Sequence, residues 1–595
     1  MTDDASPQKP ADWSDRSYYL AMPDGIRLAV SLYFPGRAPP TRPAPTLLVL
    51  TRYGRARFRR TGDPGGLDTW LAEGYVLAIV DVRGSTASFG ARDSEIGPDE
   101  QRDAETVIAH LAAQPWSDGK VVMTGVSYTA NTSDMATTRD APALVAAIPR
   151  QTDFDFWELF WPGGIANDSM FLDWSDGVYE IDFGRPRLQL GAVAVAAQDG
   201  ADVRLRPADA ARLFPTLQPV DEDADGALLQ DAVSTREAER RHWAAADYAD
   251  AAFRDDKGRN GHSFFDAGTG AHLAAVRRQG KPVQYWGSWV DANTAEGALN
   301  RYRATPDIPS VVIITPNDHG GACSGDPFHP DRHESVPSLA EQSRWHLEFA
   351  RDVLAGRRPA RVIRYYVLGA AVFRETPVWP PEGAEPVRFL LDAGGTLTHD
   401  DPAPGVDAYA VDTSASTGKE NRWYQFTRPA YGDRREEDRK LVTYDSAPLA
   451  EDTELAGWPV VTLRMRAATD DPAVFAYIED VAPDGRVTYI TEGQIRAIHR
   501  RPADPATLPY DPGPAPHAFT RAAALPVVPG ETFTLAFKLF ATAALIRRGH
   551  RIRLAIAGAD RDTFAPIPAG QPEHFTIHRG GPEPSGITLP LRPWR

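Results

Sequence analysis

The sequence predicts an α/β sheet domain that is interrupted by a helical cap and followed by an all-β domain. Three observations predict this fold class. Up to about residue 150, short apolar runs bounded by turn residues alternate with apolar residues at helical spacing. Residues 151–278 lose that alternation and hold irregular clusters of aromatic and acidic residues. From about residue 360, short strand patterns separated by Gly, Pro and Asp replace helical ones.

The first part, residues 1–150, begins with a polar arm over residues 1–17 and continues with strands and helices in alternation. Its strands are near-continuous apolar runs, which implies a sheet covered on both faces. Strand and helix in this order predict a doubly wound sheet. The expected strands are 26–34, 45–53, 75–82, 120–124 and 144–148, and the expected helices are 103–114 and the stretch after Ser127.

The second part of this domain follows the cap and covers residues 279–358. It contains expected strands over 282–289 and 308–315 and a closing helix over 339–354. The last domain, residues 359–595, reads as a jelly-roll β-sandwich because many short strands lie between turn residues. The expected strands there are 361–368, 387–391, 459–465, 474–481, 487–490, 532–539 and 550–556.

Composition excludes several classes of function. A chain of 595 residues has room for two or three domains. Its net charge of -17 opposes binding to nucleic acid or to an anionic membrane surface, because phosphates are held chiefly by Lys and Arg. A small-molecule substrate is therefore expected. The single cysteine, Cys323, excludes an intramolecular disulfide and a thiolate metal cluster.

Location and assembly are only weakly defined by the sequence. The N-terminus is acidic and polar and lacks the pattern of a secretory signal, and no apolar run reaches about 18 residues. The cytoplasm is the expected compartment. Oligomeric state is left open, with a homodimer as one option.

Ser127 lies where a strand turns into a helix, in the run Gly125-Val126-Ser127-Tyr128-Thr129-Ala130. A nucleophile elbow needs small neighbours, because its tight turn lifts the serine hydroxyl over the sheet edge beside the first amides of the next helix. Gly125 and Ala130 supply them. A lone Gly-x-Ser turn is a weak signal, so the flanking sequence has to support it.

Two later loops supply partners for this serine. Asp291 follows the strand 283–289, and His319 follows the strand 311–315. Both lie just past the C-terminal ends of strands, where such sheets place their chemistry. His319 would accept the proton of Ser127 and Asp291 would hold the imidazole tautomer. Asp318 is the rival acid, but a residue adjacent to the histidine is a less suitable partner than one on another loop.

These pieces match a known family. The chain resembles the cocaine esterase (CocE/NonD) and X-Pro dipeptidyl-peptidase hydrolases over nearly its whole length. In the first domain the matching pieces are Met22-Pro23-Asp24-Gly25, Arg52-Tyr53-Gly54, Asp81-Val82-Arg83-Gly84, Gln114-Pro115-Trp116-Ser117-Asp118-Gly119-Lys120, Gly125-Val126-Ser127-Tyr128, Gly287-Ser288-Trp289-Val290-Asp291 and Asp318-His319-Gly320. In the last domain they are Asp480-Val481, Asp484-Gly485, Gly493-Gln494-Ile495-Arg496 and Gly549-His550-Arg551-Ile552.

The resemblance implies an α/β-hydrolase domain with a helical cap and a jelly-roll domain. It implies a triad of Ser127, Asp291 and His319, with the Tyr53 hydroxyl and the backbone amide of Tyr128 as the oxyanion hole. Tyr53 follows a strand on the same sheet edge, although a strand-end aromatic can also be ordinary core.

The chain departs from the family pattern at two places. Ala130 stands where the motif usually ends in Gly, and one extra methyl there should not remove the nucleophile. Asn293 and Thr294 stand where the α-amino-acid ester hydrolases of the family carry acids that hold a substrate ammonium. This difference argues against an amino-acyl substrate.

Further candidates carry weaker signals. An acyl pocket under the cap, or ordinary core, would explain the aromatic residues Phe154, Trp157, Phe160, Trp161 and Trp174. Cys323 could be a second nucleophile, but the sequence favours a small loop residue at that position. The metal-binding HExxH pattern and the nucleotide-binding Walker and GxGxxG patterns are missing from the sequence, so neither a metal nor a cofactor is expected.

Together these observations predict a serine hydrolase that cleaves a carboxylic ester, or less readily an amide, through an acyl-enzyme on Ser127. Two alternatives stay open. One is a peptidase or amidase of the X-Pro dipeptidyl-peptidase type. The other is a non-catalytic binding protein in which the jelly roll recognises a carbohydrate or a partner and the hydrolase domain has decayed.

Overall fold

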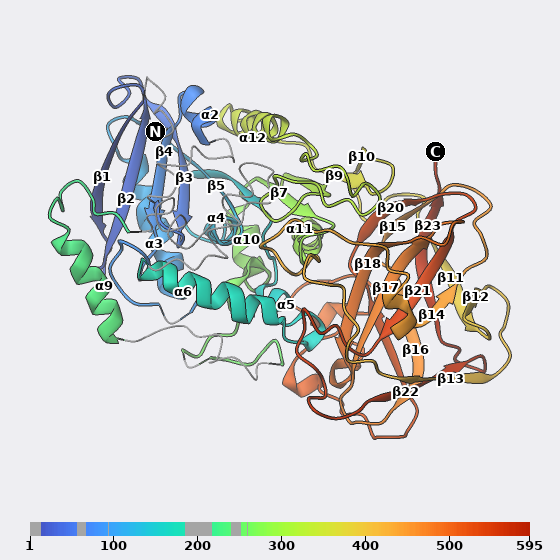
Figure 1. The fold of residues 1–595 in the computed structure, drawn as a ribbon. Coiled ribbons are helices and arrows are strands. Elements are labelled where there is room, and N and C mark those ends of the chain that lie inside the picture. The colour runs from blue at the N-terminus through green and yellow to red at the C-terminus, as the bar shows by residue number, and fades with distance from the viewer. Residues whose placement is uncertain (1–12, 56–66, 93, 185–216, 240–251, 259) are drawn as a thin grey trace, which may run out of the picture.

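Two lobes lie side by side in the computed structural model, a sheet covered by helices and a domain made mainly of strands (Figure 1). The residues that the structure describes are 13–55, 67–92, 94–184, 217–239, 252–258 and 260–595. The N-terminal strands and the C-terminal end lie in opposite lobes (Figure 1).

The first lobe is built on a ten-stranded sheet with the order β1-β2-β4-β3-β5-β6-β7-β8-β9-β10. From β4 to β9 neighbouring strands run parallel, and β1, β2 and β10 add antiparallel pairs at the edges. The strands are β1 (Trp13–Ala21), β2 (Arg27–Pro35), β3 (Ala44–Thr51), β4 (Val76–Asp81), β5 (Ser117–Val126), β6 (Leu144–Arg150), β7 (Val283–Ser288), β8 (Ser310–Thr315), β9 (Val362–Val367) and β10 (Val372–Thr376).

Helices cover both faces of this sheet. On β3, Leu48 and Leu50 belong to one buried cluster with residues of α3, α4 and α11, whereas Leu47 and Val49 belong to another with residues of α2 and α12. Alternate side chains of a strand point to opposite faces, so the two clusters are its two sides. The doubly wound arrangement is confirmed. The helices are α2 (Leu67–Ala72), α3 (Pro98–Ala112), α4 (Tyr128–Ala136), α11 (Thr294–Ala304) and α12 (Leu339–Leu354).

The insertion between β6 and β7 is helical in its described part. Its helix α9 begins at Ala227 and ends at Glu239. The helix-like polar pattern of residues 235–253 predicts a helix there, and beyond Glu239 most of that stretch lies outside the described residues. The helices in the described part of this cap are α5 (Phe156–Phe160), η1 (Pro162–Gly164), η2 (Ser169–Ser175), α6 (Asp176–Asp182), α9 (Ala227–Glu239), η4 (Phe265–Ala267), η5 (Thr269–His272) and α10 (Leu273–Gln279).

The second lobe holds thirteen strands joined in one hydrogen-bonded network. Nearly all of its pairs are antiparallel, and the described helices there are single turns at 437–440, 497–499, 505–507 and 521–523. Its strands are β11 (Glu385–Asp392), β12 (Thr396–Thr398), β13 (Gly405–Ala410), β14 (Val442–Asp445), β15 (Thr453–Gly457), β16 (Val460–Ala467), β17 (Ala473–Val481), β18 (Val487–Arg496), β19 (Phe533–Lys538), β20 (Thr542–Ile546), β21 (Arg551–Ala557), β22 (His574–Arg579) and β23 (Gly586–Pro593).

Two sequence-based expectations are wrong in detail. Residues 13–17 are not part of a polar arm, because β1 begins at Trp13 and pairs with β2 along its whole length. The strand expected at 361–368 does not join the β-rich lobe. It is β9, which pairs in parallel with β8, and β10 follows it antiparallel, so the first sheet extends past the expected boundary at residue 359.

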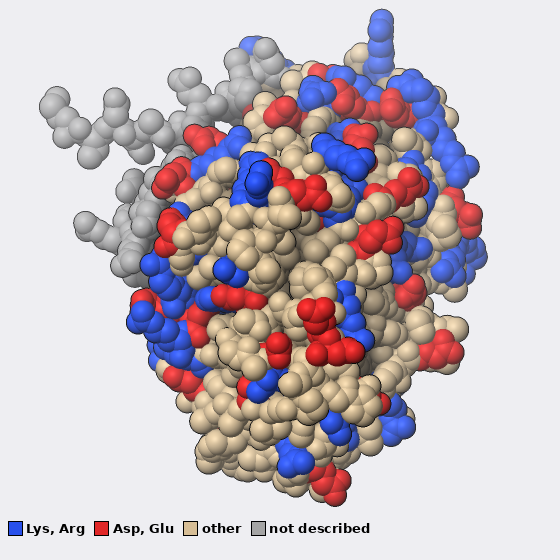
Figure 2. All heavy atoms as spheres, turned by 90° about the vertical axis from the view of Figure 1, so that its right-hand side faces the viewer, with Lys and Arg blue, Asp and Glu red and all other residues tan. Residues whose placement is uncertain are grey.

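Surface charge is mixed on the face of the β-rich lobe that Figure 2 shows. Lysine and arginine side chains there lie among aspartate and glutamate side chains (Figure 2). In the part of the chain that the structure describes, none of the helices has the length and apolar character needed to cross a membrane.

Candidate active site

Ser127 lies in a strained turn between β5 and α4. Its backbone has φ 62° and ψ -133°, a conformation that a residue with a side chain adopts only when its surroundings enforce it. The close approach of Gly125 to Thr129 provides that constraint, since a Cβ on Gly125 would lie 2.3 Å from the Thr129 carbonyl carbon. The Ser127 amide donates to the Arg150 carbonyl on β6 at 3.1 Å. The turn therefore has the geometry of a nucleophile elbow.

Asp291 and His319 meet at the same end of the sheet. The Asp291 carboxylate oxygens lie 2.9 and 3.0 Å from Nδ1 of His319. Asp291 is 1% exposed, and the Thr294 hydroxyl donates to its carboxylate at 3.3 Å and to its backbone carbonyl at 2.9 Å. A carboxylate facing Nδ1 favours the tautomer with the proton on Nδ1, which leaves Nε2 free to act as a base.

The rival residues have other partners. The Asp318 carboxylate accepts hydrogen bonds from the backbone amides of Ala322 at 2.8 Å and Cys323 at 3.1 Å, so it caps its own turn. Burial raises the pKa of the Cys323 thiol to about 11, which keeps it protonated and poorly nucleophilic near neutral pH. The acid in contact with His319 is therefore Asp291.

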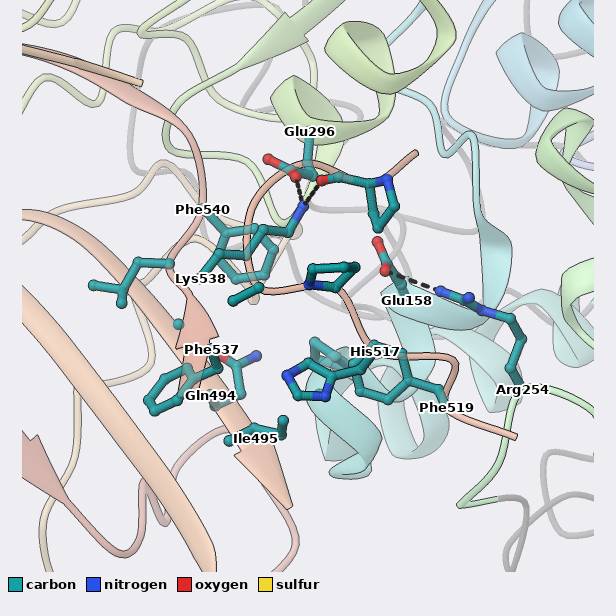
Figure 3. Close-up of a pocket in the computed structure, with 17 residues that line it drawn as sticks. Glu158, Arg254, Glu296, Gln494, Ile495, His517, Phe519, Phe537, Lys538 and Phe540 are labelled. Carbon is teal, nitrogen blue, oxygen red and sulfur yellow. Dashed lines mark hydrogen bonds and ion pairs between the residues drawn. The ribbon is translucent and has the colours of Figure 1, made fainter. Parts of the chain in front are cut away.

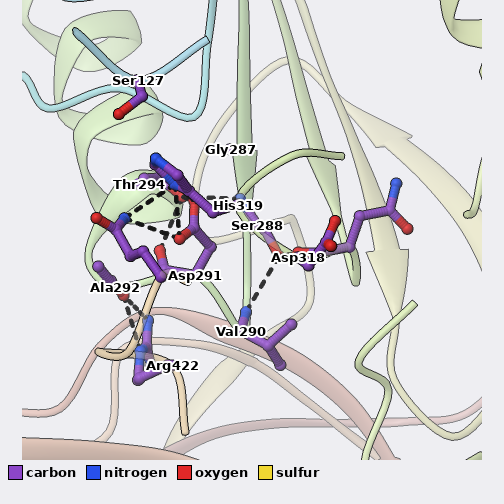
Figure 4. Close-up of polar contacts among 12 residues, drawn as sticks. Ser127, Gly287, Ser288, Val290, Asp291, Ala292, Thr294, Asp318, His319 and Arg422 are labelled. Carbon is purple, nitrogen blue, oxygen red and sulfur yellow. Dashed lines mark hydrogen bonds and ion pairs between the residues drawn. The ribbon is translucent and has the colours of Figure 1, made fainter. Parts of the chain in front are cut away.

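His319 is drawn between Asp291 and Ser127 in Figure 4. Among the residues that the structure describes, the Ser127 hydroxyl lies 3.5 Å from the Tyr53 hydroxyl and makes no hydrogen bond to His319. Hydrogen bonds between a nucleophile and its base are often long without substrate and tighten when substrate binds. The three residues predicted from the sequence thus lie at one site, although the hydrogen bond between Ser127 and His319 is not formed in this structure.

Two donors lie beside the Ser127 hydroxyl. The Tyr53 hydroxyl, just after β3, accepts a hydrogen bond from Trp174 Nε1 at 3.3 Å, so its own proton can point elsewhere. The Tyr128 amide opens helix α4, and the first amides of a helix have no acceptor within it. The Tyr53 and Tyr128 rings pack edge to face with centroids 6.1 Å apart.

A buried charge network holds this wall of the site. Arg52 pairs with Glu95 and, at 2.9 Å, with Asp182 of the cap helix α6. The Tyr128 hydroxyl donates to Glu100 and accepts from Arg92 at 3.0 Å. These groups are almost fully shielded from solvent, so the network fixes Tyr128 and the residue before Tyr53 and ties both to the cap.

The five cap aromatics do not form one pocket. Trp174 donates to Tyr53, and Phe160 packs against Trp174 with ring centroids 5.9 Å apart. Trp161 lies behind them against Phe171. Phe154 packs instead on Tyr510, and Trp157 packs on Phe519, both from the β-rich lobe. The structure thus brings Trp174 and its neighbour Phe160 to the site, whereas Phe154 and Trp157 line an interdomain contact.

Three carboxyl groups surround His319 electrostatically. Burial, the largest single effect, lowers the pKa of His319, but the charge and hydrogen bond of Asp291 together with the charges of Asp153 and Asp318 outweigh it, so the pKa is raised. Burial, and the nearby Asp291, raise the pKa of Asp153 to about 8. Burial also raises the pKa of Asp318 to about 6. Asp153 is therefore mostly neutral near pH 7, and Asp291 is the main partner for an imidazolium.

Two functional neighbours were missed by sequence reasoning. Asp153 follows β6 by three residues, at the sheet edge that carries the site, so its position was a usable signal. Gln425 donates from Nε2 to Asp291 at 2.9 Å, yet it lies 106 residues after His319 in the β-rich lobe. Nothing in the local sequence of Gln425 links it to the site.

A separate cavity lies where the cap, α11 and the β-rich lobe meet (Figure 3). Its walls include the ion pairs Glu296–Lys538 and Glu158–Arg254, and the room for solvent inside is about 60 Å³. Gln494 lines it, and neither polar side-chain atom of Gln494 has a hydrogen-bond partner among the described residues. A few waters fit this volume and would satisfy that amide. The cavity is therefore a small space between domains that is lined by two ion pairs.

Within the described ranges of the chain, no group of three or more His, Cys, Asp and Glu side chains has an arrangement that could hold a metal ion.

Comparison with known proteins places the chain in a family. A model of the X-Pro dipeptidyl-peptidase (S15 family) matches residues 24–321, and a model of the X-Pro dipeptidyl-peptidase C-terminal non-catalytic domain matches residues 358–588. A Mycobacterium bovis protein whose name describes a serine esterase is 32% identical over 97% of this chain and 95% of its own. The cocaine esterase of a Rhodococcus species is 24% identical over 96% of this chain and 97% of its own.

A solved structure has the same fold. The CocE/NonD family hydrolase of Staphylococcus aureus superposes with a TM-score of 0.67 at 18% sequence identity, and the match covers 97% of this chain and 93% of that one. The strained serine turn and the sheet order are those expected of an α/β-hydrolase, which agrees with the two family models. The chain belongs to the X-Pro dipeptidyl-peptidase (S15) family and is a serine hydrolase of the CocE/NonD type.

Proposed function

We propose that the chain hydrolyses a carboxylic ester of a small molecule through an acyl-enzyme on Ser127. The observation that carries the proposal is the contact of Asp291 with His319 at 2.9 Å, on loops that follow β7 and β8 and face the Ser127 elbow. A serine hydroxyl is a weak nucleophile at neutral pH, and this pair is suited to remove its proton.

In the first half of the reaction, Ser127 Oγ attacks the ester carbonyl carbon while His319 Nε2 takes the hydroxyl proton. The oxygen of the tetrahedral intermediate carries the negative charge, and the Tyr53 hydroxyl and the Tyr128 amide donate to it. The bond to the leaving alcohol then breaks, and His319 returns its proton to that oxygen. In the second half, water attacks the acyl-enzyme carbonyl carbon while His319 takes its proton. The bond to Ser127 Oγ then breaks, His319 returns the proton to Ser127, and the acid is released. Every step uses groups of the chain itself.

An ester whose acyl group carries no ammonium is favoured over an aminoacyl ester. A substrate ammonium needs an ionised carboxylate close to the triad, and residues 293 and 294 are Asn and Thr. Asp153, the next carboxyl group near His319, has a pKa raised to about 8 by burial and by Asp291. The alternative of an X-Pro peptidase or amidase is supported by the S15 model match. A non-catalytic binding protein is disfavoured, because the complete set of Ser, Asp, His and Tyr is present.

A paired substrate panel tests the proposal. Aryl and alkyl esters of increasing acyl size, and amides of the same acyl groups, are assayed with the wild-type chain and with Ser127→Ala. We expect ester turnover above amide turnover and a loss of about 10⁴-fold or more in kcat for Ser127→Ala. Retention of a tenth of the wild-type activity by Ser127→Ala would exclude Ser127 as the nucleophile.

A further inference from the structure

The β-rich lobe reaches into the candidate active site through residues 421–425, a segment between β13 and β14. All of its residues except Tyr424 are buried, and Arg422 and Gln425 contact the loop that carries Asp291. The model that matches residues 358–588 describes this part as a non-catalytic domain. Two side chains of the segment, however, contact the candidate catalytic residues or the turn that carries them.

Gln425 contacts both members of the Asp291–His319 pair. Its Nε2 donates to Asp291 Oδ1 at 2.9 Å and lies 3.0 Å from His319 Nδ1. In the tautomer that Asp291 selects, Nδ1 is itself a donor to the carboxylate, so the amide hydrogen of Gln425 belongs to Asp291. The carboxylate thus receives hydrogen bonds from the Gln425 amide and from His319 Nδ1, besides the one from the Thr294 hydroxyl, and these contacts restrict rotation of the imidazole away from it.

Arg422 holds the next residue of the same loop. Ala292 has φ 38°, a left-handed conformation that is strained for alanine. Its amide donates to the Arg422 carbonyl at 2.7 Å, and its carbonyl accepts from Arg422 Nε at 2.8 Å and from Nη2 (Figure 4). These reciprocal bonds hold the turn that directs Asp291 toward His319.

We propose that the β-rich lobe is part of the catalytic machinery, with Gln425 as a positioning residue for Asp291 and His319 and Arg422 as the clamp of the Asp291 turn. The proposal rests on the proposed function of the triad. It predicts that the lobe contributes to rate and to pH dependence and not only to folding.

The direction of the pH effect follows from the contacts. The positive end of the Gln425 amide lies next to Nδ1 and against the carboxylate that stabilises the imidazolium, so it disfavours protonation of His319. The other titratable groups acting on His319 are Asp291, Asp153 and Asp318. All three carboxyl groups are kept when Gln425 is replaced, and of these Asp291 loses the hydrogen bond from the Gln425 amide. Removal of the amide should therefore raise the pKa of the acid limb of kcat/KM.

The test compares Gln425→Leu with Gln494→Leu, the same substitution at a buried glutamine that lines the interdomain cavity. For Gln425→Leu we expect kcat to fall about 10- to 100-fold, the factor that corresponds to one hydrogen bond to a charged group. The acid limb should move up by about 0.5 to 1 pH unit. Gln494→Leu should keep both values within about threefold and 0.2 units of wild type, the scatter expected of a remote substitution.

Gln425→Glu is a second variant that keeps the size of the side chain. It places another carboxylate against Asp291 in place of a donor, so its kcat at pH 8 should fall at least as far as that of Gln425→Leu. Wild-type kcat and an unshifted acid limb in either Gln425 variant would overturn the proposal. If instead the Ser127→Ala variant hydrolysed the ester at the wild-type rate, the proposed function itself would fail. The two failures are therefore distinguishable.

Discussion

Tyr53 is predicted to lower the barrier by donating to the oxyanion, and Tyr53→Phe removes that single oxygen. The hydroxyl lies 3.5 Å from Ser127 Oγ, close to where the carbonyl oxygen of a bound ester would become negative. A preorganised donor stabilises that charge far more than it stabilises the neutral carbonyl. Loss of one oxyanion donor typically costs about 3 to 4 kcal/mol of transition-state stabilisation, or a factor of about 10² to 10³ in kcat.

The folded state should suffer much less than the reaction. Tyr53→Phe keeps the ring and its packing on Tyr128 but removes the acceptor of the 3.3 Å hydrogen bond from Trp174. A loss of about 1 kcal/mol in the free energy of unfolding is expected from that bond. Steady-state kinetics on an activated aryl ester and thermal unfolding of the same preparation measure the two effects separately, with KM changing far less than kcat.

Tyr444→Phe is the matched control for this experiment. The Tyr444 hydroxyl donates to Asp407 at 2.7 Å in the β-rich lobe, so the same chemical change there should cost stability and leave kcat unaltered. If Tyr53→Phe also left kcat within about threefold of wild type, Tyr53 would be a strand-end core aromatic and the oxyanion argument would be refuted.

Three further predictions concern the pair behind Ser127 and the wall of the site. Asp291→Asn should lower kcat by about 10⁴-fold, because an amide no longer selects the Nδ1–H tautomer of His319, and a loss below tenfold would point to another acid. Burial lowers the pKa of His319, but Asp291, Asp153 and Asp318 together raise it above the ordinary value of an imidazole, so kcat/KM should fall as the pH drops through that raised pKa, and a flat profile from pH 5 to 8 would contradict His319 as base. Arg52→Met leaves Glu95 and Asp182 buried without their cation and should destabilise the chain by about 3 to 5 kcal/mol, seen as a lower melting temperature; an unchanged melting temperature would remove the network from the account.

The sequence predicted the sheet well because each buried strand carries its own signal. Apolar runs bounded by turn residues predicted β3, β4, β5, β7 and β8 to within a few residues. The helix expected at 339–354 coincides with α12, whose Ser338 and Glu341 form a capping box. The polar edge strand β1 was missed because its residues alternate weakly and gain strand structure from pairing with β2.

Assignment of β9 failed for a related reason. A strand pattern at 361–368 does not specify which sheet it joins, and the expected boundary at residue 359 assigned it to the β-rich domain, although β8 and α12 directly precede it and β8 is its partner. Several short strands of the β-rich lobe, β12 and β14 among them, were missed because three or four residues give too little periodicity.

The candidate site was predictable where chemistry leaves a local trace. Ser127, Asp291 and His319 follow strand ends and lie in recognisable motifs, so the sequence could bring them together in advance. Gln425 and Arg422 lie in an irregular segment of another domain, and only the tertiary fold places them against Asp291 and Ala292. Asp153 was within reach, because it follows the end of β6 on the same sheet edge.

The central claim is that Ser127 forms the covalent intermediate, and capture of that intermediate tests it most directly. The wild-type chain is treated with a fluorophosphonate probe, digested, and mapped by mass spectrometry, with Ser127→Ala and His319→Ala treated in parallel. We expect one adduct, on Ser127, which is absent from Ser127→Ala and forms far more slowly in His319→Ala. An adduct on Cys323 or on another serine, or an inert wild-type chain that still hydrolyses esters, would contradict it.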